Sequence, residues 1–297
     1  MGDSVINWHS GVPSSTTHHL LLNNSVKIPR LGLGTFRSKG EEVKSAILWA
    51  LRSGYSQVDT ASVYKNEVEI GQALKDSGIP RENIFVTSKV SPYEQGFDNA
   101  LEAVCQILER LGTEYLDLCL IHWPGAAKLE LRSEKNKELR HETWKALEKL
   151  YLEKKCRAIG VSNFTQQHLE CLLSSGCVVK PSVNQVEMHP YLIQKPLRDF
   201  CRHNEILLQA YSPLGVGSLL ADPVVCEIAS SRQRTPAQIL LRWGLQHNVV
   251  VLPKSVKKDR IVENAAIFDF VLSNEEMARL DSLDCSHHFC WSPDGVL

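Results

Sequence analysis

The chain has 297 residues, 43% of them hydrophobic, with a formal net charge of −1 at pH 7 and a pI near 6.8. This composition is typical of a globular protein with a large core, and the near-zero charge excludes a dominant polybasic surface for nucleic acid or anionic lipid. No apolar run reaches the roughly 18 residues that a membrane helix needs, and the amino terminus lacks the pattern of a secretory signal. We therefore expect a cytoplasmic protein with neither nucleic-acid nor membrane partners.

Strand and helix signals alternate along the chain from residue 30 onward. The expected strands are short, apolar and rich in β-branched residues, and they cover residues 30–36, 55–61, 83–89, 115–122, 156–162, 181–188, 206–212 and 249–255. The expected helices cover residues 41–53, 66–78, 97–112, 141–154, 166–174, 195–203, 223–231, 236–247, 258–266 and 274–283. Eight strands, each followed by a helix, predict an α/β fold, a (β/α)8 TIM barrel, with extra helices near the carboxyl terminus.

The segments around this repeat complete the predicted organisation. Two short apolar runs in residues 18–32 flank a turn signal and predict a β-hairpin before the barrel, while residues 1–17 are expected to be loosely ordered. The polar insertion at residues 125–141 is expected to be a solvated loop and a candidate pocket wall. We expect one barrel domain over residues 1–297.

A doubly wound open sheet is the structural alternative to the barrel. That fold would favour a G-x-G-x-x-G motif at a strand-to-helix turn. The segment at 32–40 offers only Gly32-x-Gly34, with no third glycine at the required spacing. The barrel is therefore the preferred interpretation.

The nine cysteines predict neither disulfides nor a metal site. Their number is odd, they are scattered, and no two form a C-x-x-C pair. Cys105 and Cys119 lie inside apolar patterns, so we expect both to be small core residues.

Four polar residues stand where successive strand patterns end: Asp59, Tyr64, Lys89 and His122. Each alone has an ordinary explanation, such as a surface lysine or a packed tyrosine. The carboxyl ends of parallel barrel strands open onto one face, however, so these four side chains are expected to converge. A phenol, an ammonium, a carboxylate and an imidazole together suit acid–base chemistry on a carbonyl group.

Seven segments, in register over every predicted strand from about residue 20 to about 284, resemble the aldo-keto reductase family. They are GYSQVDTASVYKNEVEIG (54–71), SK (88–89), LIHWP (120–124), AIGVSNF (158–164), VNQVEMHPY (183–191), YSPLG (211–215) and LPKSVKKDRIVEN (252–264). The resemblance implies reduction of a small-molecule aldehyde or ketone with NADPH, giving an alcohol and NADP⁺.

The resemblance also assigns roles to the four strand-end residues. Tyr64 is implied to be the general acid in reduction and the base in oxidation. Lys89 is implied to lower the pKa of Tyr64 and to pair with Asp59, while His122 orients the carbonyl.

The same resemblance implies a set of binding residues. Those expected to contact the cofactor are Thr35, Phe36, Asp59, Ser162, Asn163, Gln185, Tyr211, Ser212, Leu214, Lys254, Ser255, Val256, Arg260 and Asn264. Within this set, Ser162, Asn163 and Gln185 are implied to hold the nicotinamide carboxamide and Tyr211 to stack on its ring. Lys254, Ser255 and Arg260 are implied to surround the 2′-phosphate, with Asn264 near the adenine. Those expected to line the substrate pocket are Phe36, Val63, Trp123 and Trp291.

The chain departs from the family pattern at several points. Ser56-Gln57 replace the usual Arg-His, on a part of the strand expected to lie away from the chemistry. Phe36 stands where many relatives have Trp, and both the stretch 211–222 and the tail after Asp284 are short. These departures suggest an open site.

Two other functional classes remain as alternatives. The first is a non-catalytic, cofactor-binding member of the same fold, such as a channel-associated or structural protein; the complete set of four residues favours an enzyme. The second is an aldolase-type barrel in which Lys89 or Lys254 forms a Schiff base, which needs an apolar, cation-rich surrounding. The physiological substrate is left open, and we expect a monomer, with a weak dimer as the alternative.

Overall fold

The computed structural model describes residues 18–297 and starts with an antiparallel hairpin. Strands β1 (His19–Leu21) and β2 (Lys27–Pro29) pair with Leu20 opposite Ile28. Leu20 and Ile28 are buried in the same cluster as the barrel-interior residues Leu118 and Val183. The predicted hairpin before the barrel is confirmed, and its apolar side chains close one end of the barrel interior. The expectation for residues 1–17 lies outside the described residues.

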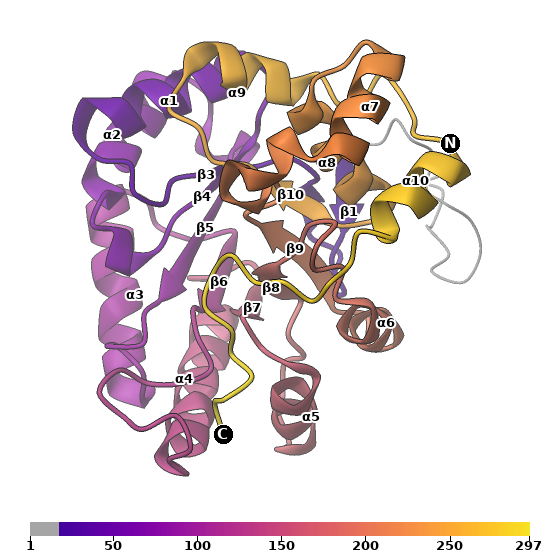
Figure 1. Cartoon of the computed structure of the whole chain (residues 1–297). Coiled ribbons are helices and arrows are strands. Elements are labelled where there is room, and N and C mark those ends of the chain that lie inside the picture. The colour runs from indigo at the N-terminus through magenta and orange to yellow at the C-terminus, as the bar shows by residue number, and fades with distance from the viewer. Residues whose placement is uncertain (1–17) are drawn as a thin grey trace, which may run out of the picture.

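Eight parallel strands follow and close into a barrel (Figure 1). They are β3 (Leu33–Gly34), β4 (Gln57–Asp59), β5 (Phe85–Val90), β6 (Leu118–Ile121), β7 (Ile159–Ser162), β8 (Val183–Glu187), β9 (Leu207–Tyr211) and β10 (Val250–Leu252). Each pairs with its neighbour in chain order, and parallel bridges from Leu31 to Val251 and from Gly34 to Lys254 join the last strand to the first. The predicted barrel is confirmed.

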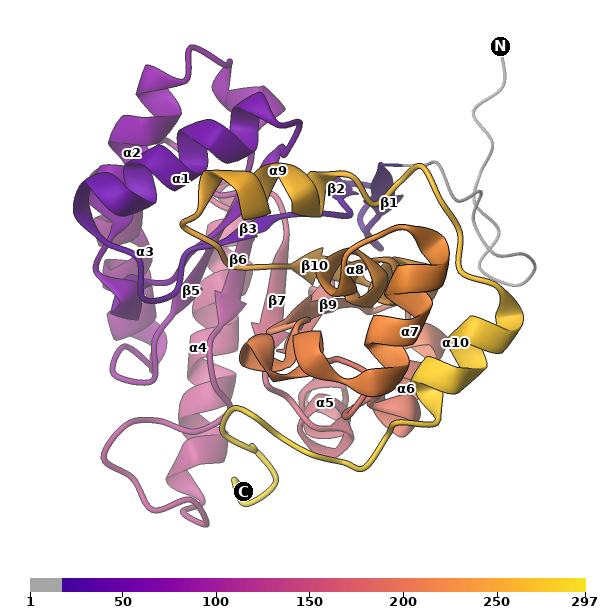
Figure 2. The same ribbon diagram turned by 45° about the horizontal axis from the view of Figure 1, so that its top comes forward.

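Helices surround the barrel on the outside. They are α1 (Gly40–Arg52), α2 (Glu67–Asp76), α3 (Phe97–Leu111), α4 (Lys135–Leu152), α5 (Gln166–Ser174), α6 (Lys195–His203), α7 (Pro223–Arg232), α8 (Pro236–Gln246), α9 (Lys258–Ala265) and α10 (Asn274–Asp281). Figure 2 shows α9 lying beside α1, so the last barrel helix packs against the first. None of the helices within residues 18–297 is long and apolar enough to span a bilayer.

Alternation along each strand separates two cores. On β6, Leu118 and Leu120 point into the barrel, whereas Cys119 and Ile121 point outward against the helices. Because successive side chains of a strand face opposite sides, the same rule directs Asp59 and Lys89 inward. The barrel interior is thus apolar at the hairpin end and polar at the carboxyl ends of the strands.

Two local expectations are wrong. Helix α4 begins at Lys135, not near 141, because the buried Asn136 fixes its first turn: its side chain accepts a hydrogen bond from the Ala126 N–H and donates to the carbonyl of Glu130. The segment 135–141 is therefore helix and not loop. Cys105 is exposed, since α3 buries its opposite face, while Cys119 is buried as expected.

Gly160 is the tightest point of the barrel interior and yields a stability prediction. A Cβ at this position would lie 2.5 Å from the Val183 carbonyl oxygen and 2.9 Å from a Leu120 methyl carbon. Gly160→Ala should lower the free energy of unfolding by about 1–3 kcal/mol, since overpacking a closed core displaces its neighbours. Chemical denaturation measures this. Gly295→Ala, whose Cβ would meet only a flexible Leu131 side chain at 3.4 Å, should be near neutral; equal effects would contradict the prediction.

Candidate active site

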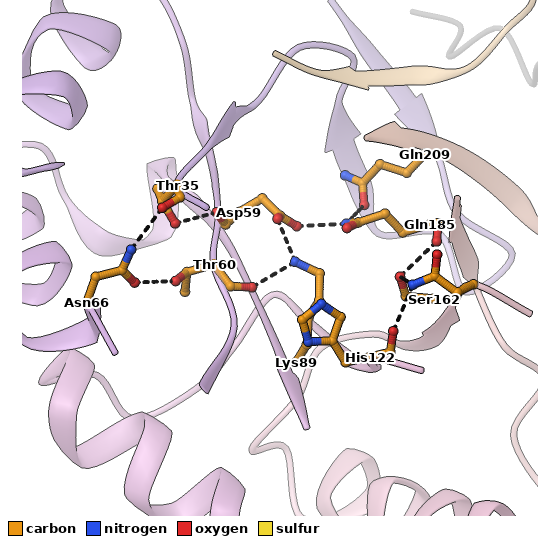
Figure 3. Close-up of polar contacts among 10 residues, drawn as sticks. Thr35, Asp59, Thr60, Asn66, Lys89, His122, Ser162, Gln185 and Gln209 are labelled. Carbon is orange, nitrogen blue, oxygen red and sulfur yellow. Dashed lines mark hydrogen bonds and ion pairs between the residues drawn. The ribbon is translucent and has the colours of Figure 1, made fainter. Parts of the chain in front are cut away.

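The carboxyl ends of neighbouring strands bring the four strand-end residues together, and Figure 3 shows three of them, Asp59, Lys89 and His122. Asp59 ends β4, Lys89 lies on β5, and His122 follows β6 directly. Tyr64 ends the short 3₁₀ helix η1 (Ser62–Tyr64) after β4. The ring of Tyr64 lies 5.7 Å from that of His122 and 5.5 Å from the Lys89 ammonium. The convergence expected from the strand pattern is present.

A buried ion pair joins Lys89 to Asp59. Lys89 Nζ donates to Asp59 Oδ1 at 2.5 Å and to the Thr60 carbonyl at 2.8 Å, and the lysine side chain has no solvent exposure. Burial lowers the pKa of Lys89, and the neighbouring Asp59 opposes this shift. An ammonium carries three donors, so one N–H is left for a group on the Tyr64 side.

The pKa of the Tyr64 phenol is shifted upward, whereas the family resemblance implied a downward shift. Burial, then the negative charge of Asp59, raise the pKa of the phenol well above its ordinary value. The net shift is therefore upward and not the expected lowering, because burial and the charge of Asp59 both disfavour a phenolate. At neutral pH the phenol keeps its proton, which is the form a proton donor requires.

His122 is held as a neutral imidazole. Burial, and then the charge of Lys89, lower its pKa to about 3. Its Nδ1 is buried without a hydrogen-bond partner among residues 18–297, whereas its carbonyl accepts from the Asn163 side chain at 2.9 Å. A neutral ring with an unused polar atom can contact a ligand oxygen without adding charge to the site.

The loop that carries Tyr64 is fixed by Asn66, which the sequence analysis did not single out. Its side chain accepts from the Thr60 hydroxyl at 2.7 Å and donates to the carbonyls of Thr35 and Ser38 (Figure 3). Thr35, an expected cofactor contact, in turn donates its hydroxyl to the Asp59 carbonyl at 2.9 Å. The available signal was an amide residue inside the motif at 54–71, between Tyr64 and a helix start.

The residues expected at the carboxamide form a second network across the barrel. Gln185 Nε2 donates to Asp59 Oδ2 and to Gln209 Oε1, both at 2.7 Å. The Ser162 hydroxyl donates to the Gln185 carbonyl at 2.8 Å. Gln185 is therefore coupled directly to the buried ion pair, a link that no sequence motif indicated.

Asn163 connects this network to Tyr211. It has a positive φ of 63°, a conformation that asparagine tolerates. Its Oδ1 accepts from the Tyr211 hydroxyl at 2.7 Å, while its Nδ2 donates to the Ser162 hydroxyl at 3.1 Å and to the His122 carbonyl. To hold a carboxamide, Asn163 would exchange one of these protein partners for the ligand.

The remaining expected cofactor residues lie around the end of β10 and the start of α9. Lys254 and Arg260 are exposed, and neither forms an ion pair within the described part of the chain. Ser255 is buried, and its hydroxyl accepts from the Lys257 N–H at 3.1 Å, while Val256 is partly buried.

Asn264 is 3% exposed, and its Oδ1 finds no partner among the described residues. Two unpaired cations suit a phosphate, and an unpaired acceptor suits an amino group on a base. The residues present therefore fit an adenine nucleotide phosphorylated on its ribose.

Of the residues expected to line the substrate pocket, three lie near the four strand-end residues. Phe36 is 52% exposed with its ring 5.1 Å from that of Tyr64, Val63 neighbours Tyr64 in η1, and Trp123 follows His122. Trp291 is 84% exposed and stacks on no aromatic ring of residues 18–297.

The carboxyl-terminal tail, residues 285–297, crosses the face of the barrel toward α4 and α5 (Figure 1). Its first residues are held by the Tyr191 carbonyl, which accepts from the N–H groups of Cys285 and His287 at 3.3 and 3.0 Å. The next anchor is the buried Glu187 at the end of β8. The N–H groups of Phe289 and Cys290 donate to this carboxylate at 2.8 and 3.2 Å. Burial opposes the ionisation of Glu187, but hydrogen bonds from His189 and from Phe289 outweigh it and lower its pKa.

The end of the tail is also held, by side chains of α5 and α4. His168 Nε2 donates to the Val296 carbonyl at 2.9 Å, and Arg140 donates to the Leu297 carbonyl at 2.7 Å. Between the anchors, the Cys290 thiol lies 3.5 Å from the Ser212 hydroxyl, just after β9. Leu214 follows there, before the 3₁₀ segment η3 (Gly215–Ala221). The tail thus contacts Ser212, one of the residues expected to contact the cofactor.

The comparisons with known proteins agree with this geometry. The family model for the aldo/keto reductase family matches residues 30–284. The chain belongs to the aldo/keto reductase family. A glyoxal reductase of Bacillus subtilis is 47% identical over 287 residues, covering 96% of this chain and all of the relative. A morphine 6-dehydrogenase of Pseudomonas putida is 43% identical over 277 residues, covering 89% and 90%.

Solved structures of family members are equally similar. An aldo-keto reductase from a deep-sea metagenome library of the Medee basin has a TM-score of 0.86 at 41% identity, covering 93% of this chain and 98% of that one. The aldose reductase of Schistosoma japonicum has a TM-score of 0.83 at 39% identity, covering 90% and 93%. Membership supports an oxidoreductase that acts on small carbonyl compounds with a nicotinamide cofactor.

The lowered pKa of His122 gives a testable pH dependence. With a pKa of about 3, the imidazole should stay neutral between pH 5 and 8, and its ring nitrogen NMR signals should not move over that range. The unfolded chain takes up this proton near pH 6.5, so the contribution of His122 to stability should be lost as the pH falls from about 6.5 toward 3. A midpoint near 6.5 for the folded protein, with free imidazole as the reference, would contradict this.

Proposed function

We propose that this protein is an NADPH-dependent reductase of aldehydes and ketones, with Tyr64 as the proton donor. The observation that carries the proposal is the convergence of Tyr64, His122 and the Lys89–Asp59 ion pair at one end of a closed barrel. When bound, NADPH would supply the hydride that reaches the carbonyl carbon. The protein's own residues orient the carbonyl and deliver the proton.

Each residue has a role that follows from its surroundings. The neutral His122 donates a hydrogen bond to the carbonyl oxygen and so fixes its position without adding charge. Tyr64 keeps its proton until negative charge develops on that oxygen, because an alkoxide is a stronger base than a phenolate. The unused N–H of Lys89 stabilises the resulting phenolate, and Asp59 keeps the lysine charged and in place.

The same observations give less support to the two alternatives, an aldolase-type barrel and a non-catalytic cofactor-binding protein. A Schiff base at Lys89 needs a neutral amine open to substrate, whereas this lysine is fully buried and paired with Asp59. A non-catalytic cofactor-binding protein would not need the neutral imidazole and protonated phenol side by side. Binding of NADPH without turnover of any aldehyde would favour that second alternative.

The name of the Bacillus subtilis relative makes a small dicarbonyl the first substrate to test. We propose glyoxal and methylglyoxal, followed by aromatic aldehydes and ketones, as the initial kinetic panel. The cytoplasm remains the expected compartment and a monomer the expected state, which sedimentation would test.

Replacement of the proton donor tests the mechanism. Tyr64→Phe removes the phenol while keeping the ring, so turnover should fall by about 10²–10⁴-fold, the usual contribution of general acid catalysis. The dissociation constant for NADPH should change little. Tyr93→Phe, at a 69% exposed tyrosine, is the matched control. Retention of most activity in Tyr64→Phe would overturn the assignment.

Replacement of Arg260 tests the choice of nicotinamide cofactor. A hydrogen bond to a charged group contributes roughly 1.5–3 kcal/mol, so Arg260→Ala should weaken NADPH binding about tenfold or more. NADH lacks the 2′-phosphate and should bind almost unchanged. Fluorescence titration of both cofactors measures this, with Arg52→Ala on α1 as a control at another exposed arginine. Equal losses of affinity for NADPH and NADH would contradict the proposed contact between Arg260 and the 2′-phosphate.

A further inference from the structure

A group of buried polar side chains lies inside the barrel below Asp59. Gln57 precedes Asp59 by two residues on β4, Thr87 pairs with Asp59 in register on β5, and Gln209 pairs with Gln185 on β9. All three point inward, because their outward neighbours Val58, Val86 and Leu208 belong to the outer core. Gln57 thus faces the same interior as Asp59, two residues further from the carboxyl end of β4.

These three residues are fully buried and incompletely hydrogen-bonded. Gln57 Nε2 and Oε1, Thr87 Oγ1 and Gln209 Nε2 have no partner among the protein atoms described here. Burying one unpaired amide or hydroxyl group costs roughly 1–3 kcal/mol on the evidence of mutants. Two donors and two acceptors in one narrow interior match the two to four polar partners that a buried water requires.

The hydrogen bonds between Gln185, Asp59 and Gln209 fix the orientation of the Gln209 amide. The amide nitrogen of Gln185 donates both of its hydrogens, one to Asp59 Oδ2 and one to Gln209 Oε1 (Figure 3). Gln209 must therefore turn its own NH2 group away from Gln185 Nε2. The Gln57 amide, also in the barrel interior, fills the space beside Gly32, where an added Cβ would lie 2.9 Å from Gln57 Cδ.

We propose that Gln57, Thr87 and Gln209 hold ordered water inside the barrel, and that this hydrated cluster supports the hydrogen-bond chain that positions Asp59. The chain runs from water through Gln209 and Gln185 to the carboxylate that holds Lys89. Gln209 is thus a positioning residue that acts on the ion pair through Gln185. This role rests on the proposed function, whereas the hydration itself does not.

The proposed water is tested by whether Thr87→Val lowers or raises the melting temperature. If water bonds the Thr87 hydroxyl, Thr87→Val should lower the melting temperature by about 2–4 °C per lost bond. Thr143→Val is the reference, because that buried hydroxyl donates to the Leu139 carbonyl and accepts from the Gly96 N–H. If the Thr87 hydroxyl is truly unpaired, Thr87→Val should instead raise the melting temperature. A rise or no change overturns the proposal.

A high-resolution crystal structure gives the direct observation. Density for water within hydrogen-bond distance of Gln57, Thr87 and Gln209 is expected. Direct contacts among the three side chains without such density would overturn the hydration.

The positioning role is tested by the pH profile of turnover. Gln209→Met keeps the size of the side chain but releases Gln185, so the ion pair loosens and Lys89 loses its proton more easily. Turnover should fall on the order of two- to tenfold, and its alkaline limb should move to lower pH. Leu207→Met, on the same strand and the same interior face, should leave the profile in place.

The outcomes separate the two ideas. A Gln209→Met profile that superposes on that of the unmodified protein overturns the positioning role. If the unmodified protein reduces no carbonyl compound, the proposed function fails and the positioning role with it. The stability and crystallographic measurements then still decide the hydration.

Discussion

The ion pair between Lys89 and Asp59 is the interaction on which the candidate site depends. Its N–O distance is 2.5 Å, and the lysine is fully buried in the barrel interior. Removing one partner would leave an uncompensated buried charge, at a cost of about 3–5 kcal/mol. The pair also joins the ends of β4 and β5, so the loop that carries Tyr64 starts from a fixed point. Fold and chemistry therefore share one constraint.

That constraint explains why the surrounding groups are polar yet rigid. Asp59 receives hydrogen bonds from Lys89 and Gln185, and its own carbonyl accepts from Thr35. One charged donor, Lys89, and one neutral donor, Gln185, bind the carboxylate, so the net charge of the site stays low while each group is oriented. Such an arrangement stabilises charge that develops on a ligand without reorganising during the reaction. The tail, in contrast, contacts the barrel only at separate anchors along its length.

Local patterns and motifs predicted most of this arrangement, and their failures have physical causes. The strand pattern predicted the convergence of Asp59 and Lys89 because the carboxyl ends of parallel strands meet on one face of a barrel. The start of α4 was missed because the Asn136 side chain bonds the loop backbone at Ala126 and Glu130, and no periodicity records such contacts. The net rise in the pKa of Tyr64 was missed because burial depends on the assembled barrel.

The anchor between Glu187 and the tail determines which tail residues can be substituted during evolution. Glu187 binds the main-chain N–H groups of Phe289 and Cys290, not their side chains. Any residue except proline offers the same N–H group. Phe289 also packs its ring against His189 and Tyr191 and is constrained by that contact, whereas Trp291 is 84% exposed. New substrate preferences could therefore arise by substitution at Cys290 and Trp291 while the main-chain anchor persists. In directed evolution, libraries at residues 290 and 291 should retain a high fraction of folded variants.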